Sequence, residues 1–130
     1  MCLRGSSEVD AVLSKNPDDR VRAYVVWVPM LYGRERDVPE ASATLDDPRA
    51  RHFWDGDGLT VTSFVPVLGV PASRGAWDVY LIYGPNARWD GPTPPAPQFW
   101  MHQLSGVTAG PYLDRAEFAE HLAEALASAR

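Results

Sequence analysis

The chain has 130 residues, which fits one compact domain and leaves little room for two. Hydrophobic residues make up 45% and charged residues 22%, as in ordinary globular proteins, so we do not expect wholesale disorder. The net charge of −5 argues against nucleic acid or a membrane surface as the main partner, and the single cysteine excludes a disulfide scaffold. We expect a cytoplasmic protein, because the sequence shows neither a secretory signal nor an apolar run of roughly 18 residues.

The first half of the chain predicts alternating helical and extended segments. Val12 and Leu13 lie on one face of a short helix, and the apolar run at 25–28 is typical of a strand. Apolar residues on both faces of that strand predict that helices cover both of its sides. The elements expected here are a helix at 6–13, a strand at 21–30 that ends at Pro29, helical turns at 40–45 and a short strand at 51–54.

The second half predicts a helix, a hairpin and a final helix. Asp114 and Glu117 have the spacing of a capping box, and Phe118 begins an apolar stripe behind them. The first elements expected here are a turn at 55–58, a helix at 59–68 whose first turns end near Pro66, and a strand at 77–83. A return strand is expected to start at 88–89, to be interrupted by prolines and to be completed at 98–104. The last element expected is a helix at 114–129. The whole order predicts an α/β fold with a mixed sheet.

Three features in this order resemble a known family. Cys2 precedes a short helix and the strand at 21–30. An aspartate-glycine turn at 55–58 is followed by the expected helix and a Gly-Val-Pro sequence that ends at Pro71. The strand at 77–83 then leads through a glycine turn to a further strand and a helix. This order resembles the thioredoxin superfamily, in particular its thiol–disulfide oxidoreductases and peroxiredoxin-like proteins. The resemblance implies a thioredoxin-like three-layer α/β/α fold, with the strand at 21–30 parallel to that at 77–83.

The chain departs from the family at its N-terminus. The family's redox motif has two cysteines separated by two residues, and Cys2 matches only the second, resolving one. The first cysteine and the first central strand would both precede Met1. The sequence therefore resembles a family member that begins inside its active-site motif, and we favour a start site assigned too late over a truncated product or a degenerate member. Without that strand we expect unpaired strand edges and a tendency to associate with another copy.

The resemblance also implies the site residues. Cys2 is the catalytic candidate, since one thiol permits a mixed disulfide with a protein thiol partner or a sulfenic acid. The substrate-binding candidates are Pro71, which matches the family's cis-proline, and Trp77 at the start of the next strand. The alternatives are a terminal cysteine without a role and an ordinary trans proline in a loop. No cofactor is expected.

A metal site receives little support from the sequence. His52, Asp55 and Asp57 are close together and His102 could approach them, but the spacing matches no known ligand signature. We therefore expect turn hydrogen bonds from the carboxylates, histidines packed beside aromatic rings, and no metal.

Large aromatic side chains are too numerous for all of them to be fully buried. Core packing is the main role expected for them, and a partly exposed patch could form a peptide-binding groove or a dimer contact. Those that flank or lie on the expected strands are Phe53, Trp54, Trp77, Tyr80, Trp89, Phe99 and Trp100. Two functions follow as hypotheses: a thiol–disulfide redox protein that uses Cys2, or a non-catalytic binding or assembly module on the same fold.

Overall fold

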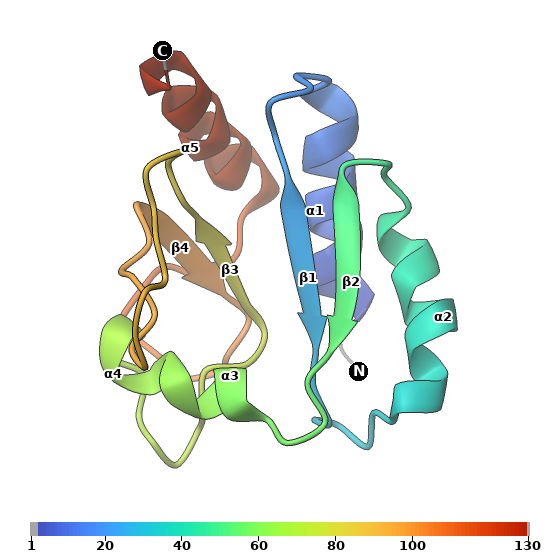
Figure 1. Cartoon of the computed structure of the whole chain (residues 1–130), viewed down its shortest axis with the longest axis vertical. Coiled ribbons are helices and arrows are strands. Elements are labelled where there is room, and N and C mark those ends of the chain that lie inside the picture. Colours follow the sequence, from blue (N-terminus) through green and yellow to red (C-terminus); the bar gives the residue numbers. More distant parts are fainter. Residues whose placement is uncertain (1–2, 130) are drawn as a thin grey trace. The chain divides into compact units, whose positions relative to one another are not determined.

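The computed structural model describes residues 3–129 of the chain (Figure 1). Its contacts divide the chain into two compact units, residues 1–58 and residues 59–130, called unit 1 and unit 2 below. Unit 1 holds a parallel pair of strands and unit 2 an antiparallel pair, so the predicted α/β class is confirmed. No helix within residues 3–129 is long and apolar enough to span a membrane. The prediction of one domain across the whole chain stays a prediction.

Unit 1 contains every element that the first half of the sequence predicts. Its elements are α1 (Leu3–Lys15), β1 (Ala23–Trp27), a 3-10 turn η1 (Glu35–Asp37), α2 (Val38–Ser42), a second 3-10 turn η2 (Ala43–Leu45) and β2 (Ala50–Trp54). The helix α1 extends beyond the predicted 6–13 at both ends, and β1 is shorter than the predicted 21–30. The 3-10 turn η2 continues α2, so the helical turns expected at 40–45 are confirmed.

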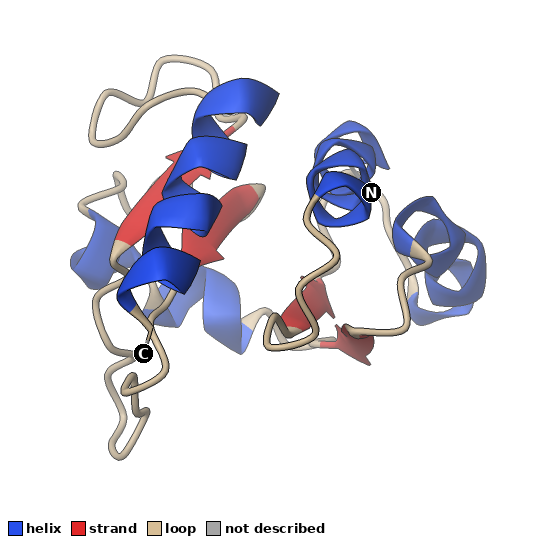
Figure 2. Cartoon of the chain, turned by 90° about the horizontal axis from the view of Figure 1, so that it is seen from above, coloured by secondary structure: helices blue, strands red, loops and turns tan. Residues whose placement is uncertain are grey.

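The strands β1 and β2 run parallel, with Ala23 opposite Ala50 and Trp27 opposite Trp54. Figure 2 shows both helices of the unit on one side of these strands. The helices bury Val12 and Leu45 on that side, together with the ring of Trp27. The core of unit 1 therefore lies between its helices and one face of a two-stranded sheet.

Arg49 fastens the end of α1 to the start of β2. Its Nε and Nη2 groups donate to the carboxylate of Asp47 at 2.9 and 2.8 Å. Its Nη2 group also donates to the carbonyl of Leu13 at 2.8 Å, and its Nη1 group donates to the carbonyls of Asn16 and Asp18 at 2.6 and 2.9 Å. All five N–H groups of the guanidinium are therefore used.

Unit 2 consists of a broken helix, a hairpin and a long helix. Its elements are α3 (Leu59–Ser63), α4 (Val65–Leu68), β3 (Val79–Ile82), β4 (Phe99–His102) and α5 (Arg115–Ser128). Pro66 lies in the first turn of α4, and Gly69 ends that helix in the left-handed conformation at φ 70°. Asp114 caps α5 by accepting a hydrogen bond from the backbone N–H of Glu117, as the sequence predicts.

Both faces of the β3–β4 hairpin are packed. On one face, Leu81 and Trp100 lie against a cluster that includes Phe64 and Leu68 from the broken helix. On the other face, the ring of Phe99 stacks on His121 of α5, with the ring centroids 3.5 Å apart. Unit 2 by itself therefore has three layers, with the broken helix, the hairpin and α5 in that order.

Two predictions about strands are wrong. A single mixed sheet is not found among residues 3–129, because β1 pairs with β2 while β3 pairs with β4. The segment expected as a short strand at 51–54 forms β2, which is as long as β1 and pairs with it in parallel. The return strand does not start at 88–89 either, because residues 83–98 form a loop and β4 begins at Phe99. Proline residues lack the N–H that a sheet ladder needs, so this loop does not continue the hairpin.

Candidate functional site

The sheet of unit 1 is open on the side opposite its helices. Tyr24 is 67% exposed, Phe53 50% and Val26 42%, although all three lie within strands. Within unit 1 the helices cover only one face of this strand, so the predicted cover on both faces is not found in this unit. Side chains alternate along β1, and only every second one, ending with the buried Trp27, points toward the helices.

Four side chains form this open face: Tyr24 and Val26 from β1, and Arg51 and Phe53 from β2. The strand register places Tyr24 opposite Arg51 and Val26 opposite Phe53. The rings of Tyr24 and Phe53 stack diagonally across the two strands, with centroids 6.5 Å apart and planes inclined by 30°. Neither strand carries a carboxylate. The open face is therefore apolar with one added positive charge.

The outer edge of β1 is also open. The N–H of Ala23 donates to the carbonyl of Arg49, and the carbonyl of Trp27 accepts from the N–H of Asp55. Backbone groups alternate in direction along a strand, so Tyr24 and Val26 direct theirs away from β2. Among residues 3–129, no strand pairs with this edge.

Within the described residues, the predicted redox site is represented by Pro71 and Trp77 alone, because Cys2 lies outside them. Pro71 is exposed, and residues 3–129 contain no cis peptide bond, so the cis form that the resemblance implies is not found. Trp77 packs against the core of unit 2, and its indole N–H donates to the carbonyl of Arg74 at 3.1 Å. The substrate-binding roles of Pro71 and Trp77 stay predictions.

His52 and His102, the two histidines considered above as metal ligands, are held by hydrogen bonds. The indole N–H of Trp27 donates to Nδ1 of His52 at 3.0 Å, so Nε2 carries the proton and donates to the carbonyl of Leu45 at 3.0 Å. His102 is bound in the same way between the N–H of Leu104 and the carbonyl of Gly110, both at 2.9 Å. Neither ring keeps a free lone pair for a metal ion, and residues 3–129 contain no group of three or more possible ligands.

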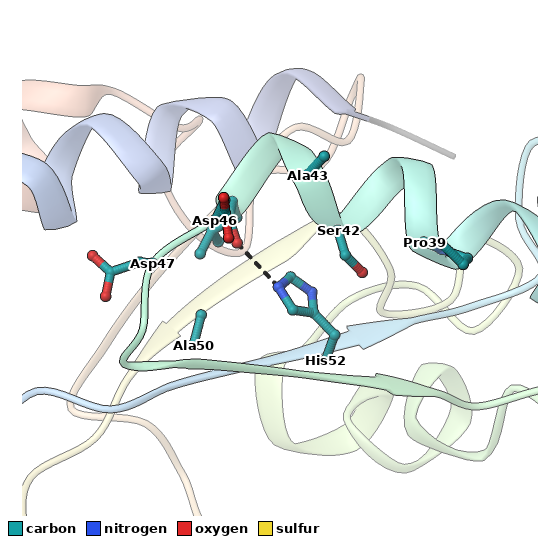
Figure 3. A pocket seen from close by; sticks show the side chains of 8 residues that line it. Pro39, Ser42, Ala43, Asp46, Asp47, Ala50 and His52 are labelled. Carbon is teal, nitrogen blue, oxygen red and sulfur yellow. Dashed lines mark hydrogen bonds between the residues drawn. The ribbon is translucent and has the colours of Figure 1, made fainter.

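A hollow with a volume of about 300 Å³ lies beside His52 in unit 1 (Figure 3). Its acidic residues are Asp46 and Asp47, and the carboxylate of Asp47 points away from the His52 ring. Hydrogen bonds from Arg49 lower the pKa of Asp47, which holds that carboxylate in its ionised form. Since both nitrogens of His52 are used, the hollow offers no general acid–base pair.

Two further aromatic residues, Tyr83 and Trp89, make contacts within unit 2. In unit 2, Trp89 is 49% exposed and meets the ring of Phe64 edge-on at 5.6 Å. The hydroxyl of Tyr83 donates to the carbonyl of Pro95 at 2.7 Å, and burial raises the pKa of this tyrosine. These contacts attach the proline-rich loop to the rest of unit 2.

Sequence reasoning missed Tyr24 and Val26 as surface residues. The alternation did contain a signal, because Arg22, two residues before Tyr24, and Arg51, two residues before Phe53, continue the same alternation. Charged residues at these positions mark the solvent side of a strand.

Comparisons with known proteins leave the family open: no family model, no curated protein and no solved structure matches the chain.

Proposed function

We propose that this chain is a protein-binding or assembly module whose contact surface is the open face and outer edge of the β1–β2 sheet. The observation that carries the proposal is the stacked pair of Tyr24 and Phe53, half or more exposed on a sheet that is packed on its other side. Exposed aromatic clusters of this kind mark interaction surfaces, and tyrosine is enriched among the residues that dominate binding energy.

The chemistry of the partner follows from the geometry. An unpaired strand edge binds an extended polypeptide through backbone hydrogen bonds, and alternate side chains of the added strand contact the face beside it. Tyr24 and Val26 are the strand residues nearest to such a partner, so its side chains above the open face would be apolar.

The thioredoxin-like fold is part of the same proposal. The order helix, strand, helix, strand, helix, hairpin, helix is the one on which the resemblance rests. The layered hairpin of unit 2, followed by α5, supports the C-terminal part of that assignment. The three-layer α/β/α arrangement remains a proposal for the chain as a whole, whereas the single mixed sheet is not found among residues 3–129.

The test is a titration with an extended peptide of alternating valine and threonine, followed through backbone amide NMR signals. We expect the amide signals of Tyr24 and Val26 to shift. Tyr24→Ser should weaken binding about tenfold or more, as expected for the loss of a central aromatic contact. Tyr32→Ser is the matched control, because Tyr32 is 97% exposed outside the strands. Absence of binding, or equal effects of the two variants, would contradict the proposal.

A second candidate function is thiol chemistry at Cys2, and one observation favours it. The helix α1 begins at Leu3, directly after the cysteine in sequence, and its first turn has no acidic residue. The free N–H groups at a helix N-terminus stabilise a thiolate. A thiol-reactive probe should then label Cys2 at about pH 6 far faster than a cysteine in an unstructured peptide. A rate at or below that of the peptide would exclude an activated thiol.

A further inference from the structure

The outer edge of β1 has the geometry to pair with a second copy of itself. Its outward-facing residues, Tyr24 and Val26, are placed symmetrically about Val25. In an antiparallel pair of two β1 strands with Val25 opposite Val25 of the other copy, Tyr24 of each copy lies opposite Val26 of the other. Both members of each such pair direct their backbone groups into the interface, so two residues per copy exchange four hydrogen bonds.

The side chains on the open face are complementary in this register. The register within unit 1 places Val26 beside Phe53 and Tyr24 beside Arg51. Pairing of two copies would form a four-stranded sheet with two identical rows of side chains across it. Each row contains Phe53 and Val26 of one copy, followed by Tyr24 and Arg51 of the other. An aromatic residue opposite a β-branched residue is a favourable cross-strand pair, and the two arginines lie at opposite ends of the sheet, away from each other.

The edge also lacks the features that prevent such pairing. The strand Ala23–Trp27 contains no proline, no lysine and no charged side chain, and Pro29 lies beyond its end. Natural edge strands are usually protected by such residues or by a covering segment. The edge of β3 is a weaker candidate, because its side chains are half-buried or buried on both faces.

We infer that two copies of this chain associate through antiparallel pairing of their β1 strands, and this inference rests on the proposed function. The interface is small and isologous, so the association is concentration-dependent rather than permanent. Its occupant is a second copy of this chain, and the peptide probe described above would compete with it for the same backbone groups.

The first test is sedimentation equilibrium over a concentration series. We expect a monomer–dimer equilibrium, which Val26→Pro weakens about tenfold or more because it removes one of the two exchanged N–H groups in each copy. Val26→Thr keeps the N–H and the β-branched shape, so it is the matched control. A dimer that Val26→Pro leaves unchanged would overturn the inference.

The second test needs no variant and therefore does not depend on the folding of one. In the unmodified chain, hydrogen exchange at the amides of Tyr24 and Val26 should slow as the protein concentration rises, while exchange at exposed loop amides stays constant. A chain that is monomeric throughout but binds the peptide in a Tyr24-dependent way would overturn self-pairing and leave the proposed function intact. A monomer that does not bind the peptide would overturn both.

Discussion

The side chain of Arg49 joins several segments of unit 1. Its guanidinium joins the last turn of α1, the following loop and the start of β2 through five N–H groups. Both partners of its ion pair are nearly buried, with 13% of the Arg49 side chain and 11% of the Asp47 side chain exposed. The geometry depends on a planar fork of donors, which lysine does not have.

Arg49→Lys should therefore destabilise the chain although it keeps the charge. Lysine has three donors and cannot bind the carboxylate through two parallel bonds, so at least two of the five acceptor contacts would be lost. We expect the free energy of unfolding to fall by about 2–4 kcal/mol, measured by urea denaturation. Arg36→Lys is the control, because Arg36 is exposed in η1 and its replacement should change stability by less than about 0.5 kcal/mol. Equal effects of the two changes would contradict the role assigned to Arg49.

The same ion pair predicts a loss of stability in acid. Hydrogen bonds from Arg49 lower the pKa of Asp47 below its ordinary value near 3.8, so the folded state holds the ionised carboxylate more strongly than the unfolded chain does. The stabilisation is complete above the unfolded value and disappears as the pH falls through the lower, folded pKa. Asp47→Asn should remove much of the dependence of unfolding free energy on pH below about 4, where the unfolded carboxylate titrates.

Asp18 provides the contrast for that measurement. A side-chain hydrogen bond from Arg20 lowers the pKa of Asp18 to about 2, but this pair is exposed to solvent. Exposed ion pairs contribute little to stability. Because solvent screens this pair, Asp18→Asn should change the acid limb of the stability curve less than Asp47→Asn does, and a larger effect than that of Asp47→Asn would show that the assignment is wrong.

At the scale of elements, local sequence signals located most helices and strands. The Asp114–Glu117 spacing marked the start of α5, and Pro66 marked the break between α3 and α4. The pairing of strands was not predicted, because it depends on contacts between segments distant in sequence. The role of Arg49 was missed for the same reason, since its carbonyl partner in Leu13 lies 36 residues away.

The open face was missed for a different reason. A continuous apolar run such as 25–28 is compatible with a strand buried on both sides and with a strand that binds a partner on one side. The run itself does not distinguish these cases, whereas the exposure of Tyr24 and Val26 in the structure does. The apolar run at 25–28 therefore contributes side chains both to the proposed contact surface and to the core.

The loop that follows β4 requires glycine at position 110. A Cβ atom at Gly110 would lie 2.7 Å from the ring of Trp100, and the carbonyl of Gly110 accepts the hydrogen bond from His102. Gly110→Ala should displace the ring and lower the unfolding free energy by about 1–3 kcal/mol, measured by thermal or urea denaturation. Gly91→Ala is the matched control, since no atom lies within 4 Å of a Cβ there, and it should be neutral or slightly stabilising. A neutral Gly110→Ala would contradict the close packing of Trp100.

At the scale of the whole molecule, net charge opposes the association that the open face favours. Each copy carries a charge of −5, so two copies repel each other at long range. The proposed interface itself contains no opposite charges across the β1 strands, and its contacts are backbone hydrogen bonds and apolar side chains. Added salt should therefore act on the repulsion and leave the contacts largely unaffected.

The repulsion between two negatively charged copies determines the sign of the salt effect on self-association. Raising the ionic strength from about 0.01 M to about 0.1 M shortens the screening length from roughly 30 Å to 10 Å, which removes most of the repulsion between copies. We expect the dimer fraction measured by sedimentation equilibrium to increase over this range at neutral pH. Val26→Pro should remain largely monomeric at both ionic strengths, because screening does not restore its missing N–H. Association that weakens with salt would instead indicate contacts between opposite charges, and would place the interface away from the β1 edge.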